Sequence, residues 1–250
     1  MLKFPYENPP IVEAILDLRV KFKDAFVLSQ FDSFKTSIAD EFPIALPIHL
    51  MEVTMQSDSG DGQSLPKASE PTQVGIRLSN NLNNRVLQLQ QGGFTFSHLA
   101  PYSNWESMRD EAKSLWKIFC ETSPPFVVTR CAVRFINRIS IPKSKIEPAE
   151  YFKLYPTIPK DIHQNIVGML LQLQMPQPDL GESVAVINMA LVQPEKPLHT
   201  TILLDIDLSS TIGEVEPTSL NIWDAFELFR ERKNTLFESL ITTKSRRLFK

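Results

Sequence analysis

Strand-like and helix-like hydrophobic patterns follow one another in the same order twice along this 250-residue chain. Each half begins with a strand of alternating apolar and polar residues, continues with a helical pattern and several further strands, and ends in an amphipathic helix. This order predicts an α+β fold, with a curved antiparallel sheet and helices on one face. We therefore expect a single domain, residues 1–250, built from two similar halves at about residues 10–121 and 126–242.

The first half opens on an alternating strand that directly follows Pro9 and Pro10. Proline has no backbone N–H to donate, so pairing should begin at Ile11 or later. The preceding Phe4 and Tyr6 should pack as an extended arm over the edge of the core. The expected ranges are 12–22 for this strand, 28–42 for the first helix, and 49–56, 73–79, 85–91 and 94–99 for four further strands.

Two other segments of the first half have clear signals. The stretch at 56–73 is polar and rich in turn residues, which predicts a flexible loop between two strands. A long helix is expected to open at Ser103, with Glu106 three residues later completing a capping box.

The second half opens on a long strand at residues 126–141, and a short helical stretch at 148–155 follows it. The final helix runs from about Ile222, capped by Asn221, to about Thr242. Three strand-like runs lie between them, at residues 166–175, 183–192 and 199–208. One face of the long strand is expected to hold Val127, Thr129, Cys131, Val133, Phe135 and Ile139.

The doubled order of strand, helix, four strands and helix resembles the topology of the TATA-box-binding protein, a curved antiparallel sheet with helices on its convex side. That DNA-binding saddle uses apolar wedges and basic residues on its concave face. Here the corresponding face carries carboxylates as well as arginines, and the net charge is −3. Duplex DNA is therefore not the expected partner.

Five separated motifs also resemble a sporadically distributed family of uncharacterised bacterial and archaeal proteins of similar length. The motifs are NPPIVEAILDLRV, GGFTFSHLAPYSNWESM, VRFINRI, TILLDIDL and WDAFELF with LFESLIT. They fall in order over nearly the whole chain. The resemblance implies no established activity, cofactor or substrate, and the patchy distribution of the family suggests a link to mobile or defence gene clusters.

Three rows of charged residues on the strands are the candidate ligand-binding residues. Residues two or four apart on a strand face the same way, so each row shares one face of the sheet. If the first strands of the two halves pair, the acids of one will face the arginines of the other. The rows are Glu13 with Asp17, Arg130 with Arg134 and Arg138, and Asp205 with Asp207.

Two interpretations of these rows stay open. The first, which we favour, is a cross-strand salt-bridge ladder, in which each pair contributes about 0.2–1 kcal/mol. It places Arg130 and Arg134 within reach of Glu13 or Asp17, with Asp205 or Asp207 close by. The second is an anion site in which Arg134 and Arg138 bind a phosphate or carboxylate bidentately.

Other kinds of site have little support in the sequence. Asp205 and Asp207 form a candidate metal pair, but no third ligand stands at a suitable spacing. The glycine-rich phosphate-binding motifs are missing, the four histidines are scattered, and two cysteines are too few for a zinc site. We therefore predict no catalytic residue, no metal and no cofactor.

The sequence as a whole predicts a non-catalytic binding or interaction protein whose partner is another protein or a small anionic ligand. The alternative is an enzyme or sensor that binds a phosphorylated or nucleotide-like anion on the Arg/Asp face of the sheet. The chain shows neither a signal-peptide pattern nor an apolar run of about 20 residues, which predicts a cytoplasmic protein without membrane association. A homodimer stays open.

Overall fold

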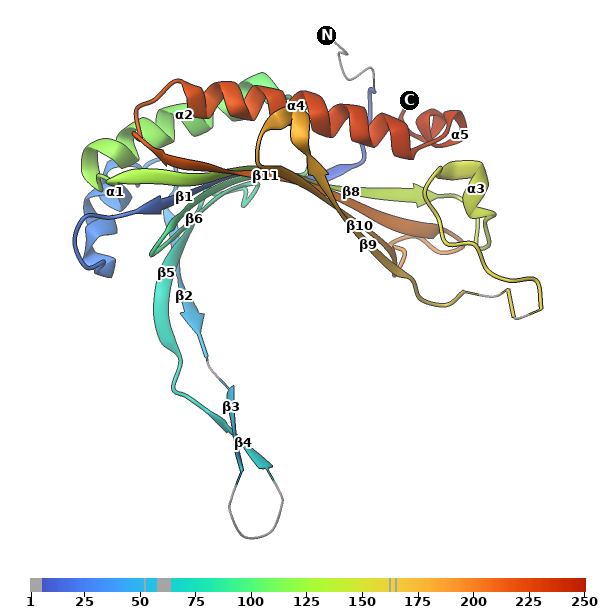
Figure 1. The fold of residues 1–250 in the computed structure, drawn as a ribbon, viewed down its shortest axis with the longest axis horizontal. Helices are drawn as coiled ribbons and strands as arrows, with labels where there is room; N and C mark the ends of the chain where they lie inside the picture. The colour runs from blue at the N-terminus through green and yellow to red at the C-terminus, as the bar shows by residue number, and fades with distance from the viewer. Residues whose placement is uncertain (1–5, 52, 58–63, 162, 165) are drawn as a thin grey trace.

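The computed structural model describes residues 6–51, 53–57, 64–161, 163–164 and 166–250. Their main feature is a curved, nine-stranded antiparallel sheet with the order β2-β5-β6-β7-β1-β8-β11-β10-β9 (Figure 1). The predicted α+β class is therefore confirmed. The strands are β1 (Ile11–Lys21), β2 (Ile44–Leu50), β5 (Thr72–Ser79), β6 (Arg85–Gln90), β7 (Gly93–Leu99), β8 (Val127–Ile141), β9 (Leu170–Gln177), β10 (Ser183–Val192) and β11 (Thr200–Val215).

The opening strands of the two sequence halves, β1 and β8, pair with each other in the middle of the sheet. On their outer sides, β1 pairs with β7 and β8 pairs with β11, so each opening strand lies beside the last strand of its own half. This order is what two similar halves would produce. That residues 10–121 superpose on residues 126–242 stays a prediction.

Two long helices, α2 (Trp105–Thr122) and α4 (Asn221–Leu240), cover the convex face of the sheet (Figure 1). The apolar stripe of α2 is buried throughout, and five large apolar residues of α4 are buried as well. None of the helices in the described residues lies on the opposite, concave face (Figure 1). The stripes are Trp105, Met108, Ala112, Leu115 and Phe119 on α2, and Ile222, Trp223, Phe226, Phe229 and Phe237 on α4.

Short helices complete the convex layer. They are η1 (Leu28–Phe31), α1 (Asp32–Ser37), α3 (Pro148–Tyr151), η2 (Pro178–Leu180), α5 (Thr243–Arg246) and η3 (Arg247–Phe249). The first predicted helix is therefore shorter than the expected 28–42, although four of its apolar residues, Phe31, Phe34, Ile38 and Phe42, are buried. Thr36, Ser37 and Asp40 favour turns over helix, and Pro43 ends the segment.

The caps of both long helices differ from the predictions. Asn104, not Ser103, caps α2, because its side chain accepts a 2.7 Å hydrogen bond from the backbone N–H of Ser107. Helix α4 begins at Asn221 itself and has no side-chain cap. It also ends at Leu240, and Thr242 instead caps the short helix α5.

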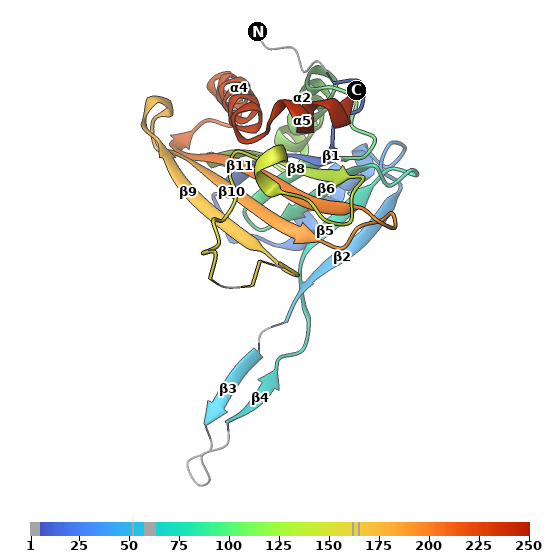
Figure 2. The ribbon, with the colours of Figure 1, turned by 90° about the vertical axis from the view of Figure 1, so that its right-hand side faces the viewer.

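The flexible loop predicted at 56–73 is wrong where the structure shows strands, at residues 56–57, 64–68 and 72–73. Strands β3 (Val53–Ser57) and β4 (Ser64–Ala68) pair as a separate hairpin that projects away from the sheet (Figure 2). Residues 58–63 lie outside the described residues. Most of β3 falls within the strand predicted at 49–56, whereas β4 lies wholly inside the stretch predicted as a loop. The polar, turn-rich composition of that stretch gave no strand signal for β4.

The bounds of three other strands also differ from the predicted ones. β2 starts at Ile44 and β9 at Leu170, and β11 continues to Val215 beyond the predicted 208. Thr129 is not buried with the other residues of its predicted face, because a register shift between the Arg19 and Val20 pairs brings Val128 into the core instead. Where one strand of a pair has an extra residue, the residues beyond that point face the opposite side of the sheet from the side that simple alternation predicts.

The start of the chain follows the prediction. The first pair of β1 is Ile11 with Asn137, directly after Pro10. The Tyr6 ring packs edge-on against Phe249, with centroids 5.2 Å apart, and its hydroxyl donates a 2.7 Å hydrogen bond to Glu238. Tyr6 thus packs over the core edge, whereas Phe4 lies outside the described residues.

Candidate functional site: a charged pocket on the concave face

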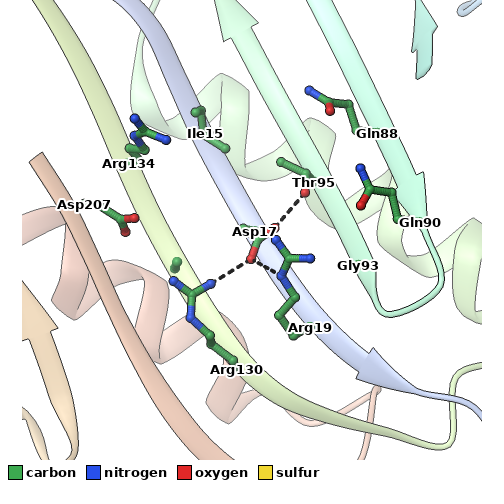
Figure 3. A pocket seen from close by; sticks show the side chains of 11 residues that line it. Ile15, Asp17, Arg19, Gln88, Gln90, Gly93, Thr95, Arg130, Arg134 and Asp207 are labelled. Carbon is green, nitrogen blue, oxygen red and sulfur yellow. Dashed lines mark hydrogen bonds and ion pairs between the residues drawn. The ribbon is translucent and has the colours of Figure 1, made fainter. Parts of the chain in front are cut away.

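Alternation along β1 separates a core row from a charged row. Leu16 and Leu18 are buried beneath the helices, and the residues between and beside them, Ile15, Asp17 and Arg19, face the opposite side of the sheet. Residues opposite one another in an antiparallel pair share a face, so the β8 partners of this row, Arg134, Ala132 and Arg130, lie beside it. Figure 3 shows this surface.

Asp17 is the centre of the hydrogen-bond network on this face. Its Oδ1 atom accepts a 2.6 Å hydrogen bond from the Thr95 hydroxyl. Its Oδ2 atom accepts bonds from Arg19 Nε at 3.0 Å and Arg130 Nη1 at 2.9 Å (Figure 3). Because Asp17 is only 7% exposed, one buried carboxylate fixes two guanidinium groups from neighbouring strands.

Arg134 pairs with a different acid. Its Nε and Nη2 atoms donate to the two carboxylate oxygens of Asp205 at 2.9 and 2.8 Å, and Asn188 adds a third donor at 3.0 Å. Hydrogen bonding to Asp205 raises the pKa of Arg134, so this cation stays charged. Asp205 is 2% exposed, which makes the pair half-buried rather than a surface contact.

The predicted ladder is therefore right in kind and wrong in part of its pairing. Arg130 contacts Asp17 as expected, but Arg134 contacts Asp205 instead of Glu13 or Asp17. Arg138 reaches Glu195 at 3.1 Å and the Gln193 carbonyl at 2.8 Å, in the connection after β10.

The structure consequently does not bring Arg138 to the anion site that the sequence suggested with Arg134. The Glu13 side chain makes no ion pair or hydrogen bond within the described part of the chain. These partners depend on which strands are neighbours in space, which the sequence pattern does not encode.

A cavity of about 280 Å³ lies between β1, β6, β7, β8 and β11 on this face. We call it the concave pocket. Its volume is just below the range of about 300–1,000 Å³ that is usual for small-molecule sites. The residues that line it are Ile15, Asp17, Arg19, Gln88, Gln90, Gly93, Thr95, Arg130, Ala132, Arg134 and Asp207.

Four polar lining residues, Arg19, Gln88, Gln90 and Thr95, were not among the predicted site residues. A usable signal was present for two of them. Gln88 and Gln90 alternate with the buried Leu87 and Leu89 on β6, so their side chains must face away from the core.

Asp207 lines the concave pocket without a hydrogen-bond donor. No residue that the structure describes donates to its carboxylate, and its Oδ1 atom is buried. Burial raises the pKa of Asp207, and this outweighs the opposite effect of the nearby positive charges of Arg130 and Arg134. A polar group in this state is a feature of functional sites.

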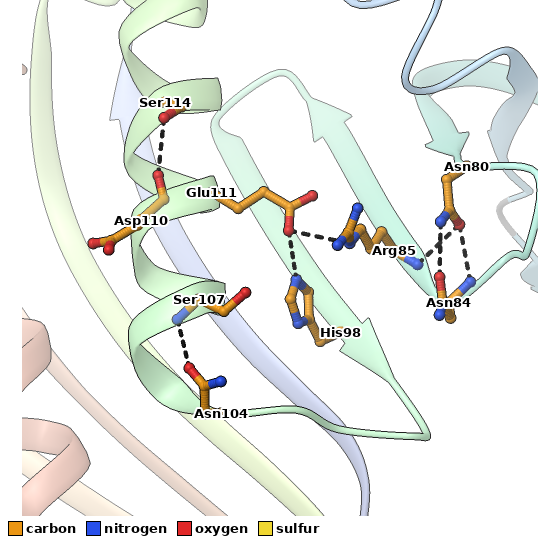
Figure 4. Close-up of polar contacts among 9 residues, drawn as sticks. All are labelled: Asn80, Asn84, Arg85, His98, Asn104, Ser107, Asp110, Glu111 and Ser114. Carbon is orange, nitrogen blue, oxygen red and sulfur yellow. Dashed lines mark hydrogen bonds and ion pairs between the residues drawn. The ribbon is translucent and has the colours of Figure 1, made fainter.

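A second polar cluster lies on the helix side of the sheet and joins α2 to β6 and β7 (Figure 4). One oxygen of Glu111 lies 3.0 Å from His98 Nε2 and 3.1 Å from Arg85 Nε. The His98 ring is buried and packs edge-on against Phe96. These contacts hold the helix on the sheet, so we assign the cluster a structural role.

The structure offers little support for metal or thiol chemistry. The described residues contain no group of three or more His, Cys, Asp or Glu side chains arranged to hold a metal ion. Burial raises the pKa of both Cys120 and Cys131 to about 12, so both thiols stay protonated at neutral pH. In the part of the chain that is described, no helix is long and apolar enough to cross a membrane.

No protein-family model matches this chain, and no curated protein matches its sequence. The resemblance to a sporadically distributed bacterial and archaeal family therefore stays a prediction.

Proposed function

We propose that this protein is a non-catalytic binding protein and that the concave pocket holds a small polar ligand. The observation that carries the proposal is the way Asp17 fixes Arg19 and Arg130 at the pocket wall. Each guanidinium has five N–H donors, but Arg19 uses only Nε and Arg130 only Nη1 toward described residues. Donors that are already oriented can bind a ligand with little loss of side-chain entropy.

The polar residues that surround these donors also support binding. Gln88, Gln90 and Thr95 present amide and hydroxyl groups, while Ile15 and Ala132 add an apolar floor. A few oriented polar groups on rigid strands are the usual design of a site for a small ligand.

The second candidate is an enzyme or sensor that takes a phosphorylated or nucleotide-like anion. Remaining N–H groups of Arg19, Arg130 and Arg134 at one cavity favour an anionic group on the ligand. Asp207, with its raised pKa, would then be the group to examine for proton transfer. Turnover of a bound phosphate ester would favour this candidate over simple binding.

The cellular setting belongs to the proposal as well. The free thiols of Cys120 and Cys131 suit a reducing cytoplasm. The family resemblance adds a link to mobile or defence gene clusters, which the neighbouring genes of related sequences would test. A protein partner or a homodimer would use the same concave face. The molecular mass measured in solution would distinguish a homodimer or a protein complex from a monomer that binds a small ligand.

A thermal-shift screen tests the proposal, because a ligand that binds the native state raises its stability. The probes are inorganic phosphate, nucleoside monophosphates, amino acids and dicarboxylates. We expect at least one probe to raise the melting temperature of the wild type and to lose this effect in Arg130→Gln. Arg138→Gln, an arginine outside the pocket, is the matched control and should keep the shift.

Two outcomes would contradict the proposal. One is the absence of a shift with every probe. The other is an equal shift in Arg130→Gln and Arg138→Gln, which would place binding elsewhere on the molecule.

A further inference from the structure

Asp207 is the acid of the concave pocket that the ladder leaves without a partner. In the register of β8 and β11 it stands directly opposite Arg134. Arg134 nevertheless directs both of its hydrogen bonds to Asp205, two residues earlier on β11. The arginine opposite Asp207 is therefore hydrogen-bonded to another carboxylate.

The other charged groups near Asp207 do not donate a hydrogen bond to it either. Arg130 donates to Asp17, and the two remaining neighbours, Asp17 and Asp205, are themselves acids. On β10 the residue opposite Asp207 is Val186, whose side chain has no donor. Figure 3 shows the Asp207 carboxylate across the pocket from Asp17, with no contact drawn to it. The Asp207 carboxylate therefore has a buried Oδ1 atom and lacks a donor among the described residues.

The pocket also holds hydrogen-bond donors, with Arg130 between Asp17 and Asp207 and Arg19 on the far side of Asp17 (Figure 3). Arg19 and Arg130 have N–H groups left over after bonding to Asp17, and both line the cavity with Asp207. A cavity of about 280 Å³ is small enough that one ligand would contact both the arginines and Asp207. The pocket thus offers N–H donors and an unsatisfied acceptor within one cavity.

We propose, on the basis of the function proposed above, that the ligand is a small zwitterion that carries an amine close to a carboxylate or phosphate. The anionic group contacts the guanidinium groups of Arg19 and Arg130, and the ammonium donates to Asp207. Asp207 is then the specificity-determining residue of the pocket. An anion without the amine would leave this carboxylate unpaired and add a second negative charge beside it, which costs affinity.

Matched pairs of probes that differ only by an amine test this inference. One pair is glycine and acetate, and the other is β-alanine and propionate. All four carboxylates are ionised at neutral pH, and the two amino acids differ in the distance between amine and carboxylate. Titrations followed by NMR chemical shifts give each dissociation constant. In one of the two pairs at least, we expect the wild type to bind the amino acid about tenfold more tightly than the plain carboxylate, as a charge-assisted hydrogen bond predicts.

Two variants assign the preference to one carboxylate. Asp207→Asn should bind both members of the pair within about twofold of each other, because the ammonium has lost its charged partner. Glu195→Gln changes an exposed acid outside the pocket and should keep the tenfold preference.

Three results would overturn the inference. Equal binding of both members to the wild type would do so while leaving the pocket as an anion site. A tenfold preference that survives in Asp207→Asn would also do so, because the amine would then have another partner. If no probe binds the wild type, the zwitterion inference falls, and a thermal shift with another ligand class would show that the proposed binding function survives it.

Discussion

Arg134 on β8 donates two hydrogen bonds, of 2.9 and 2.8 Å, to the carboxylate of Asp205 on β11. The two partners differ in exposure, since the side chain of Arg134 is 43% exposed and that of Asp205 only 3%. Water can therefore solvate the arginine but not the acid. Loss of the arginine would leave a buried negative charge with Asn188 as its remaining donor.

Arg134→Ala should accordingly lower the free energy of unfolding by about 3 kcal/mol, the lower end of the range for breaking a buried pair. Arg138→Ala is the matched control, because its partner Glu195 is 72% exposed and such pairs contribute about 0–1 kcal/mol. Urea unfolding measures both. An equal loss of unfolding free energy in the two variants would show that Asp205 is better solvated than its burial indicates.

Asp207→Asn should stabilise the unliganded protein at neutral pH by about 1 kcal/mol, since it removes the charge of a half-buried carboxylate whose Oδ1 atom has no donor. The pKa of Asp207 is raised in the folded state, so the folded protein holds its proton to a higher pH than the unfolded chain. Wild-type stability should therefore fall as pH rises from about 4 through the folded-state pKa. The variant lacks this titration.

Urea unfolding of both proteins between pH 4 and pH 8 tests that expectation. The stability difference should grow with pH in favour of Asp207→Asn. A difference that stays constant across this range would mean that Asp207 titrates alike in the folded and unfolded states.

Lys233 gives a pH dependence of the opposite sign. Its side chain is 2% exposed, and its amine lies 3.6 Å from the centroid of the Phe135 ring. The ring favours the ammonium form, but burial dominates and lowers the pKa of Lys233 well below its usual value of 10.5. The folded protein thus binds fewer protons than the unfolded chain, and its stability should rise with pH up to about 10.5.

Lys233→Met, which keeps the shape of the side chain and removes its charge, should lack this rise. The stability of the variant relative to the wild type should be greatest near neutral pH and decline toward pH 10. Chemical denaturation at several pH values gives the comparison. Parallel pH profiles for the two proteins would contradict the expected titration.

Deletion of residues 1–8 should destabilise the protein moderately, by about 2–4 kcal/mol, and leave the fold intact. The deletion removes the packing of Tyr6 on Phe249, its hydrogen bond to Glu238 and the backbone bond from Asn8 to Phe249. Tyr6→Phe, which keeps the ring, should cost only about 1 kcal/mol. A truncated protein with the wild-type melting temperature would show that the arm does not contribute.

Local patterns in the sequence were sufficient to predict those strands and helices whose apolar residues recur with a clear period. The alternation of β1 fixed the face of Asp17, and the stripe of α2 identified Trp105, Met108 and Phe119 as core residues. Pro9 and Pro10 fixed the start of pairing at Ile11. These features follow from backbone geometry, because each depends on neighbours within one strand or helix.

Pairing across strands was decided by the tertiary structure. The sequence placed Arg134 and the acids on one face, but the choice of Asp205 over Glu13 and Asp17 depends on β11 lying beside β8. Arg19, Gln88 and Thr95 likewise join one pocket only because β6, β7, β1 and β8 are consecutive in the sheet. Side-chain partners across a sheet are set by strand order and register, which arise from burial of the whole core rather than from any single segment.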